Sequence, residues 1–244
     1  MNPRIKFPGA AGVVPHDLGG VRLVSRAGDV ALEDVSAIKA TLAALPANAD
    51  LSDRVKGVYD QGQIAACTCY SSAAMQSIFE EIEQGAWLGF DALECYHAVG
   101  GNGTQGVDPH LVLDYMKQPG LLDVDTKQRY RIQSYAFVRL GPQGQIDVVK
   151  AALAANRPAV LAMLLPADWG QGDGQSQGGP RSSSYHQVCL TGYDADRAYF
   201  VNSQGVGWGD HGFGSVPWSF TLDPEQGSSC YAYTAVDAAD GANG

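Results

Sequence analysis

A single helix, entered through a glycine turn and a cysteine, constrains what this chain can fold into. The lead-in, residues 58–66, contains Gly62, and a helical pattern begins at Cys67. Apolar side chains then follow at intervals of four, at Tyr70, Ala74, Ile78 and Ile82. That spacing places them on one face of a helix, so we expect a helix that begins at Cys67 and buries this face.

The start of this helix also offers chemistry. A cysteine in the first helical turn sees the positive end of the helix dipole, which favours thiolate over thiol. Gln61, six residues before Cys67, can reach back with its amide NH2 group. Together they supply a nucleophile and a donor for a developing oxyanion. A lone cysteine at a helix start is more often a small buried hydrophobe, so the assignment depends on residues far downstream.

Composition and charge exclude several classes of protein. A length of 244 residues suffices for one large domain or two lobes that share an interface. No apolar run approaches the ~20 residues that a membrane helix needs. The net charge of −10 argues against nucleic acids and acidic membrane surfaces. We therefore expect no nucleic-acid partner and no membrane partner.

The five cysteines indicate free thiols in a reducing compartment. Cys67 and Cys69 are too close in sequence to pair comfortably, and no CxxC pair is present for zinc. We expect no metal and no cofactor. Arg4 and Lys6 are not followed by the apolar core of about 7–15 residues that a Sec signal peptide requires. The expected location is the cytoplasm, or an exterior reached without a cleaved Sec signal.

The predicted elements are helices first and strands later, the order of an α+β fold. Helical patterns occupy residues 32–45, 90–99, 108–117 and 146–155, and strand patterns occupy residues 21–24, 129–138, 158–165, 185–193 and 198–201. Residues 170–184 are rich in glycine, serine and glutamine, which is typical of a surface loop.

His186 and Asn202 are candidates for the base that a Cys67 nucleophile needs and for the residue that orients this base. His186 opens an apolar strand, Asn202 closes the next one, and the turn 194–197 makes the two strands a plausible hairpin. Residues near the open ends of a hairpin are neighbours, so Asn202 can orient the imidazole of His186. Alone, each has an ordinary explanation as a structural histidine or a turn former. With Cys67 they compose a thiol nucleophile, its base and the residue that orients the base.

Three blocks, residues 61–71, 185–186 and 202–213, together resemble the papain family of cysteine peptidases. The lead-in 58–62 and the threonine at position 68 look most like the bacterial branch of that family. The match covers roughly residues 46–235. The resemblance implies a two-lobed α+β fold. Its central helix starts at the catalytic cysteine in a helical lobe, an antiparallel sheet or barrel forms the other lobe, and a cleft lies between them.

The resemblance also implies boundaries within the chain. The peptidase domain spans residues 46–235, with a helical lobe of about 58–125 and a β-rich lobe of about 126–235. Residues 1–45 form an N-terminal extension, and residues 236–244 a C-terminal tail. Because members of the family often carry an N-terminal inhibitory segment, we expect residues 1–45 to lie along or near the cleft and to restrain activity.

Each residue of the catalytic set matches a role in the family. Cys67 matches the nucleophile, His186 the base that forms an ion pair with it, and Asn202 the residue that holds that histidine. Gln61 matches the glutamine that forms the oxyanion hole with the Cys67 backbone N–H. Cys69 is expected to be structural, since it points about 200° away from Cys67 around the helix.

Substrate-binding positions follow from the same resemblance. The stretch at Gln105, Gly106 and Val107 falls where the family binds the substrate backbone, with only Gly106 kept from its glycine pair. Ala162 and Gln187 fall near the pocket for the second residue before the scissile bond. Gln204 stands where a tryptophan normally covers the His–Asn hydrogen bond, so we expect water to reach that pair more easily.

The activity implied is hydrolysis of peptide bonds in polypeptides through a Cys67 thioester, by a protein that acts as a monomer. Two alternatives stay open. A transamidase or cyclase would pass the same thioester to an amine, and a degenerate papain fold would bind a peptide or protein without cleaving it.

Overall fold

Helix α2, Cys67–Gln84, is the axis around which the described residues are arranged. The computed structural model describes residues 5–6, 26, 29–140, 144–222 and 230–236. The helix begins at Cys67, as predicted, and Gly85 ends it with a φ of 67°. Almost every side chain from Cys67 to Glu80 is buried, including the serines. The helix is therefore enclosed on all sides, where the spacing of apolar residues predicted one buried face.

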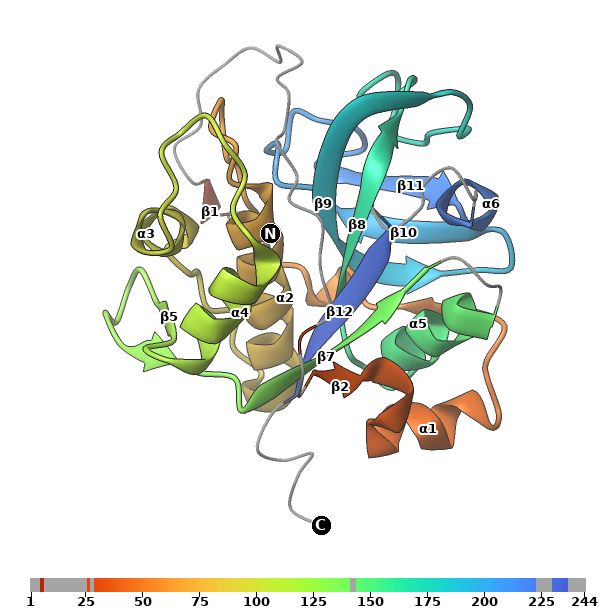
Figure 1. Ribbon diagram of the computed structural model, residues 1–244, viewed down its shortest axis with the longest axis horizontal. Coiled ribbons are helices and arrows are strands. Elements are labelled where there is room, and N and C mark those ends of the chain that lie inside the picture. The colour runs from red at the N-terminus through yellow and green to blue at the C-terminus, as the bar shows by residue number, and fades with distance from the viewer. Residues whose placement is uncertain (1–4, 7–25, 27–28, 141–143, 223–229, 237–244) are drawn as a thin grey trace.

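Two shorter helices pack against α2 on one side, forming the left half of Figure 1. Helix α3, Ala92–Ala98, is capped by the Asp91 carboxylate, which accepts from the Glu94 backbone N–H. Helix α4, Pro109–Lys117, is capped in the same way by Asp108. Both confirm predicted helices. A small hairpin of β5, Leu121–Leu122, and β6, Arg129–Tyr130, completes this half.

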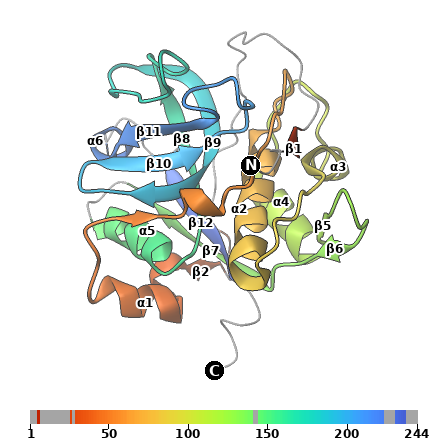
Figure 2. The same cartoon turned by 180° about the vertical axis from the view of Figure 1, so that it is seen from behind.

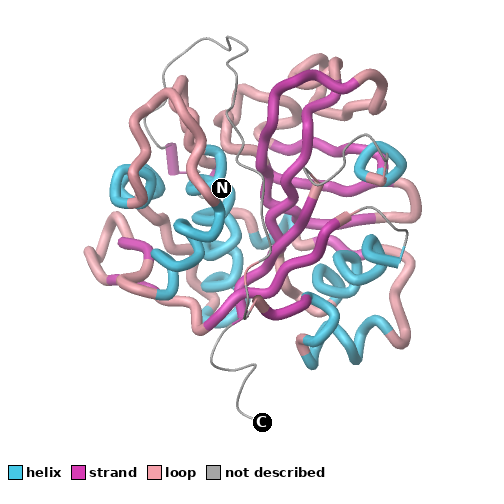
Figure 3. Tube along the Cα trace, in the orientation of Figure 1, coloured by secondary structure: helices cyan, strands magenta, loops and turns pink. Residues whose placement is uncertain are grey.

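A large sheet forms the other half, and Figure 3 shows its strands gathered beside α2. Its order is β11-β10-β9-β8-β12-β7-β2, and β3 pairs with β9 off this path. Every pairing is antiparallel except that of β2 with β7. The strands are β2 Val30–Ala31, β3 Ala49–Asp50, β7 Ser134–Arg139, β8 Ala159–Pro166, β9 Arg181–Tyr193, β10 Arg197–Val201, β11 Phe213–Pro217 and β12 Tyr231–Val236. The expected α+β fold with an antiparallel sheet is confirmed.

The central strand β8 is buried on both faces, which explains why its sequence is continuously apolar. Along β8, Val160 and Ala162 belong to the core that includes α2. Leu161 and Met163 alternate with them and belong to a second core beyond the sheet. Helices α1, Ser36–Leu42, and α5, Gly144–Ala154, close that second core, and Figure 2 shows them together from behind.

Short elements complete the chain. Two 3-10 turns, η1 Leu32–Asp34 and η2 Ser52–Arg54, flank α1 and β3, and α6, Trp218–Thr221, follows β11. The predicted helix over residues 32–45 is thus divided into η1 and α1. The strand predicted at 21–24 and most of the C-terminal tail, residues 237–244, lie outside the described residues.

The second half of the N-terminal extension packs on the large sheet and on α5. Strand β2 pairs with β7, and α1 packs on α5. At the other end, β1, Ile5–Lys6, pairs in parallel with β4, Gly57–Val58. Residues 7–25 lie outside the described residues, so the expectation that the extension restrains activity stays a prediction.

A buried carboxylate fixes the docked part. Asp29 accepts a hydrogen bond from His110 Nε2 at 3.3 Å and from the Tyr135 hydroxyl at 3.2 Å. The side chains of Asp29 and His110 are only 5% and 2% exposed. Arg26 bonds to Asp108 and Asp114 nearby, but these groups are exposed and contribute little.

We predict that Asp29→Ala lowers the free energy of unfolding by about 2 kcal/mol, because His110 and Tyr135 lose their buried acceptor. Urea unfolding followed by circular dichroism measures the loss. The matched control is Asp34→Ala, since Asp34 is exposed in the same segment and should change stability by less than about 0.5 kcal/mol. Equal effects of the two substitutions would contradict the anchoring role of Asp29.

Candidate active site

Cys67 lies where α2 begins, against strand β9. Its side chain is buried, and its sulfur is within hydrogen-bond reach of the backbone of Gln187. Gln187 is the residue after His186 on β9. The fold therefore brings the predicted nucleophile and the predicted base to adjoining positions, although more than a hundred residues separate them in sequence.

His186 and Asn202 form the hydrogen bond that the sequence predicts. Strands β9 and β10 pair as a hairpin, and Asn202 directly follows β10. His186 Nε2 lies 2.8 Å from Asn202 Oδ1, and both residues are buried. An amide oxygen only accepts, so Nε2 carries the proton and Nδ1 keeps a lone pair. His186 Nδ1 is buried and has no hydrogen-bond partner among the described residues. That atom is free to accept a proton.

Gln61 is held beside this pair by Ser203. The Ser203 hydroxyl donates to Gln61 Oε1 at 2.6 Å, and the Gln61 backbone N–H donates to the Ser203 carbonyl at 2.8 Å. Gln61 Nε2 donates to the Ile64 carbonyl at 2.8 Å. An amide NH2 has two hydrogens, so a second one remains for a ligand. The positioning role of Ser203 was not predicted; the only sequence signal was a hydroxyl beside Asn202.

The loop predicted to bind substrate backbone is tied to the start of α2. The Gly103 carbonyl accepts from the Ala65 N–H at 3.2 Å, and the Val107 carbonyl accepts from the Thr68 hydroxyl at 3.5 Å. Within the described part of the chain, no hydrogen bond uses the backbone of Gly106. Gln105 is exposed, and Gly106 is half-buried. The loop therefore presents a free backbone edge near Cys67.

Ala162 and Gln187 occupy the interior. Both are fully buried and lie opposite each other on β8 and β9. Gln187 Nε2 donates to the Tyr231 hydroxyl at 2.9 Å, and its Oε1 accepts from the Tyr233 hydroxyl at 3.1 Å. With its amide engaged in this way, Gln187 supports the sheet behind Cys67. A role of these two residues as walls of a substrate pocket stays a prediction.

Burial sets the protonation of the two reactive groups. It raises the pKa of the Cys67 thiol to about 11, and backbone hydrogen bonds at Gln187 and Thr68 only partly oppose this. Burial likewise lowers the pKa of His186 to about 4, and the hydrogen bond that His186 donates to Asn202 only partly opposes this. The direction for Cys67 is opposite to the one predicted from its place at a helix start. Between these two pKa values burial keeps both side chains neutral.

The expected exposure of the His–Asn pair is not found. His186 is 0% and Asn202 2% exposed, because the Trp169 ring lies against the imidazole at 5.4 Å between centroids. Cys69 is fully buried in the core beside α2, in agreement with a structural role. All five cysteines are free and buried.

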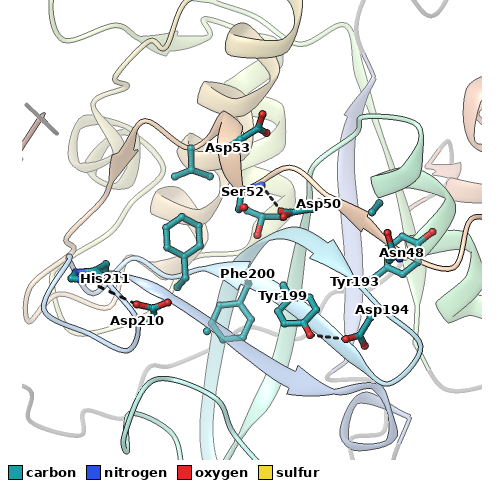
Figure 4. Close-up of a pocket in the computed structure, with 15 residues that line it drawn as sticks. Asn48, Asp50, Ser52, Asp53, Tyr193, Asp194, Tyr199, Phe200, Asp210 and His211 are labelled. Atoms are coloured by element: carbon teal, nitrogen blue, oxygen red, sulfur yellow. Dashed lines mark hydrogen bonds and ion pairs between the residues drawn. The ribbon is translucent and has the colours of Figure 1, made fainter. Parts of the chain in front are cut away.

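A separate pocket of about 730 Å³ lies away from these residues. Figure 4 shows its carboxylates and rings, and the lining includes none of Cys67, His186, Asn202 or Gln61. The pocket is bordered by four carboxylates, those of Asp50, Asp53, Asp194 and Asp210. Among the described residues, no helix combines the length and the apolar character of a membrane span. The same residues contain no group of three or more His, Cys, Asp or Glu side chains that could hold a metal ion.

We predict that His186 makes stability fall in acid. Its pKa is about 4 in the folded state and about 6.5 in the unfolded state, so between these values the unfolded state binds the extra proton. The stabilisation is complete above the unfolded value and is lost as the pH falls towards 4. When the pH is lowered from ~7.5 to ~4.5, His186 should reduce the free energy of unfolding by about 2–3 kcal/mol.

Urea unfolding of the wild type and of His186→Gln at both pH values isolates that contribution. The variant should lose less stability on acidification by about the same 2–3 kcal/mol. Parallel losses in the two proteins would mean that His186 is not held neutral in the folded state.

Comparisons with known proteins agree with this arrangement. No family model and no curated protein matches the chain. Solved structures do. Xylellain, a cysteine protease from Xylella fastidiosa, superposes with a TM-score of 0.73 at 19% identity, over 93% of this chain and 100% of its own.

Two further structures are similar. Procathepsin B S9 from Trypanosoma congolense gives a TM-score of 0.70 at 14% identity, over 90% of this chain and 87% of its own. The Carica candamarcensis cysteine protease CMS1MS2, solved with E-64, gives 0.66 at 20% identity, over 79% of this chain and 99% of its own. Similarities at such low identity show the fold alone. Together with the topology described above, they identify it as the papain-like cysteine protease fold.

Proposed function

We propose that this chain is a cysteine peptidase that hydrolyses peptide bonds through a thioester on Cys67. The observation that carries the proposal is His186 Nδ1, a buried base that has no hydrogen-bond partner in the described part of the chain and whose ring is held through Nε2 by Asn202. A base of this kind beside a helix-start cysteine is the arrangement that thiol catalysis requires. The papain-like fold supports the same reading, since the similar structures are described as cysteine proteases.

The first half of the reaction forms the thioester. His186 Nδ1 takes the Cys67 proton as the sulfur attacks the carbonyl carbon of the peptide bond. The resulting oxyanion accepts hydrogen bonds from the free N–H of the Gln61 amide and from the Cys67 backbone, which lacks a helical acceptor. The C–N bond then breaks, and the departing amine takes the proton from His186.

The second half releases the acid. Water gives a proton to His186 Nδ1 and attacks the thioester carbonyl. The C–S bond breaks, and the proton returns to the Cys67 sulfur. The substrate chain is expected to lie along Gly106, whose backbone groups make no hydrogen bond within the part of the chain that the structure describes.

We predict that an epoxysuccinyl-peptide reagent adds once to the wild type and not to Cys67→Ala. The matched control is Cys69→Ala, which removes a thiol two residues away and should still give one adduct, because Cys69 is enclosed in the core. Intact-mass spectrometry measures the adducts, and a fluorogenic peptide library then tests cleavage. Labelling of no thiol, with tight binding of an uncleaved peptide, would replace the peptidase with a binding protein.

We propose further that the N-terminal extension restrains this activity. Support comes from β1, which pairs with β4, a strand that ends three residues before Gln61 in the sequence. A variant that begins at Arg26 keeps the Asp29 anchor and α1. We expect it to cleave a fluorogenic peptide at least severalfold faster than the full chain at equal stability. Unchanged cleavage by a folded variant would refute the restraint.

A further inference from the structure

The His186–Asn202 hydrogen bond is covered by a tryptophan from a distant loop. Trp169 lies in the segment after β8, more than thirty residues before Asn202 in sequence. Its ring meets the His186 imidazole edge to face, with 5.4 Å between centroids and 69° between planes. Aromatic pairs of this geometry are mutually attractive. The ring therefore both contacts the imidazole and shields it from water.

Gln204 connects this ring to Asn202. Its Oε1 atom accepts from Trp169 Nε1 at 3.3 Å and from Asn202 Nδ2 at 2.7 Å. Because Nδ2 of Asn202 is engaged by Gln204, its Oδ1 is directed to His186 Nε2. That direction in turn determines which imidazole nitrogen carries the proton. The Ser203 backbone N–H also donates to Asn202 Oδ1, at 2.8 Å, so Gln204 and this backbone group together fix the amide orientation on which the tautomer of His186 depends.

Trp169 is itself firmly supported. Its ring stacks on Phe200 at 5.4 Å with 17° between planes, and lies against Trp208 at 5.0 Å. The loop is fastened at the preceding residue, Asp168. The Asp168 carboxylate accepts from the Ser176 hydroxyl at 2.6 Å and from the Gln177 backbone N–H at 2.7 Å. The glycine-rich segment beyond Trp169 is therefore folded back and held, which keeps the ring over the imidazole.

We propose that Trp169 and Gln204 act as one positioning unit that holds the Asn202 amide and the His186 imidazole in their reactive orientation and keeps water from them. Neither residue is hydrogen-bonded to His186 Nδ1, which has no hydrogen-bond partner among the described residues. Their effect on turnover rests on the proposed peptidase function, whereas their effect on the environment of Cys67 and His186 does not.

Peptide cleavage tests the effect on turnover. Trp169→Ala should lower kcat/KM about tenfold through kcat, with KM little changed, since the unit orients the base and does not bind substrate. Trp169→Phe keeps a ring but loses the N–H donor, so its kcat/KM should lie between those of the wild type and Trp169→Ala. Gln204→Ala should match Trp169→Ala, and the double variant should be little worse than either, because both residues act on the same Asn202–His186 pair. The matched control is Trp218→Phe, a buried tryptophan on α6, which should leave kcat/KM unchanged.

Alkylation of Cys67 by iodoacetamide tests the same unit without a substrate. Opening the cover hydrates the site, so the burial that raises the pKa of Cys67 should weaken in Trp169→Ala. The pH profile of alkylation, read by intact mass, should then move to lower pH by about one unit. The Trp218→Phe profile should coincide with that of the wild type.

The outcomes separate the two proposals. A wild type that is alkylated at Cys67 but cleaves no peptide contradicts the peptidase, and the alkylation profiles still decide the positioning unit. Wild-type profiles in both Trp169→Ala and Gln204→Ala would overturn the unit, as would fully additive losses in the double variant. If Trp169→Ala fails to fold, Trp169→Phe and Gln204→Ala decide in its place.

Discussion

The pairing of β9 with β10 is the constraint on which the site depends. Their register shifts between Tyr199 and Phe200, whose partners are Gly192 and Leu190, so Thr191 is an extra residue on β9. Side chains alternate between the faces of a sheet, and a slip of one residue would turn Asn202 away from His186. The carbonyl of Thr191 accepts from the Leu51 N–H, which ties the irregular position to the strand that follows the N-terminal extension.

Buried hydrogen bonds join the two halves of the molecule directly behind Cys67. Ser72 of α2 shares a hydrogen bond with the Tyr233 hydroxyl at 2.9 Å, and Tyr233 donates to Gln187 on β9. All three residues are fully or almost fully buried. Polar groups at such positions are costly unless paired, so this chain of bonds accepts only one placement of the helix against the sheet. The position of the thiol against β9, the strand that carries His186, follows from it.

Enclosure of the reactive pair has a chemical consequence. Because both Cys67 and His186 are buried, charge separation between them is opposed by lost hydration. The Trp169 ring adds to this enclosure, and Gln204 orients the amide beneath it. In the proposed mechanism the histidine is therefore a neutral base of fixed tautomer, and the attack on the substrate is coupled to transfer of a proton.

Local and medium-range patterns in the sequence determined the helix that starts at Cys67, the β9–β10 hairpin, the order of an α+β fold and the pairing of His186 with Asn202. These features depend on side-chain periodicity and on turns between neighbouring strands, so residues close in sequence suffice to predict them. Only the tertiary structure decided the enclosure of α2 on all sides, the Asp29 anchor and the Ser203 contact to Gln61. It also decided that Trp169, from a distant loop, covers the His186–Asn202 hydrogen bond. It also reversed the direction predicted for the pKa of Cys67. Each of these depends on burial and on contacts between segments that are distant in the sequence. The local sequence around Cys67 or Gln204 does not reveal which distant segments cover these residues.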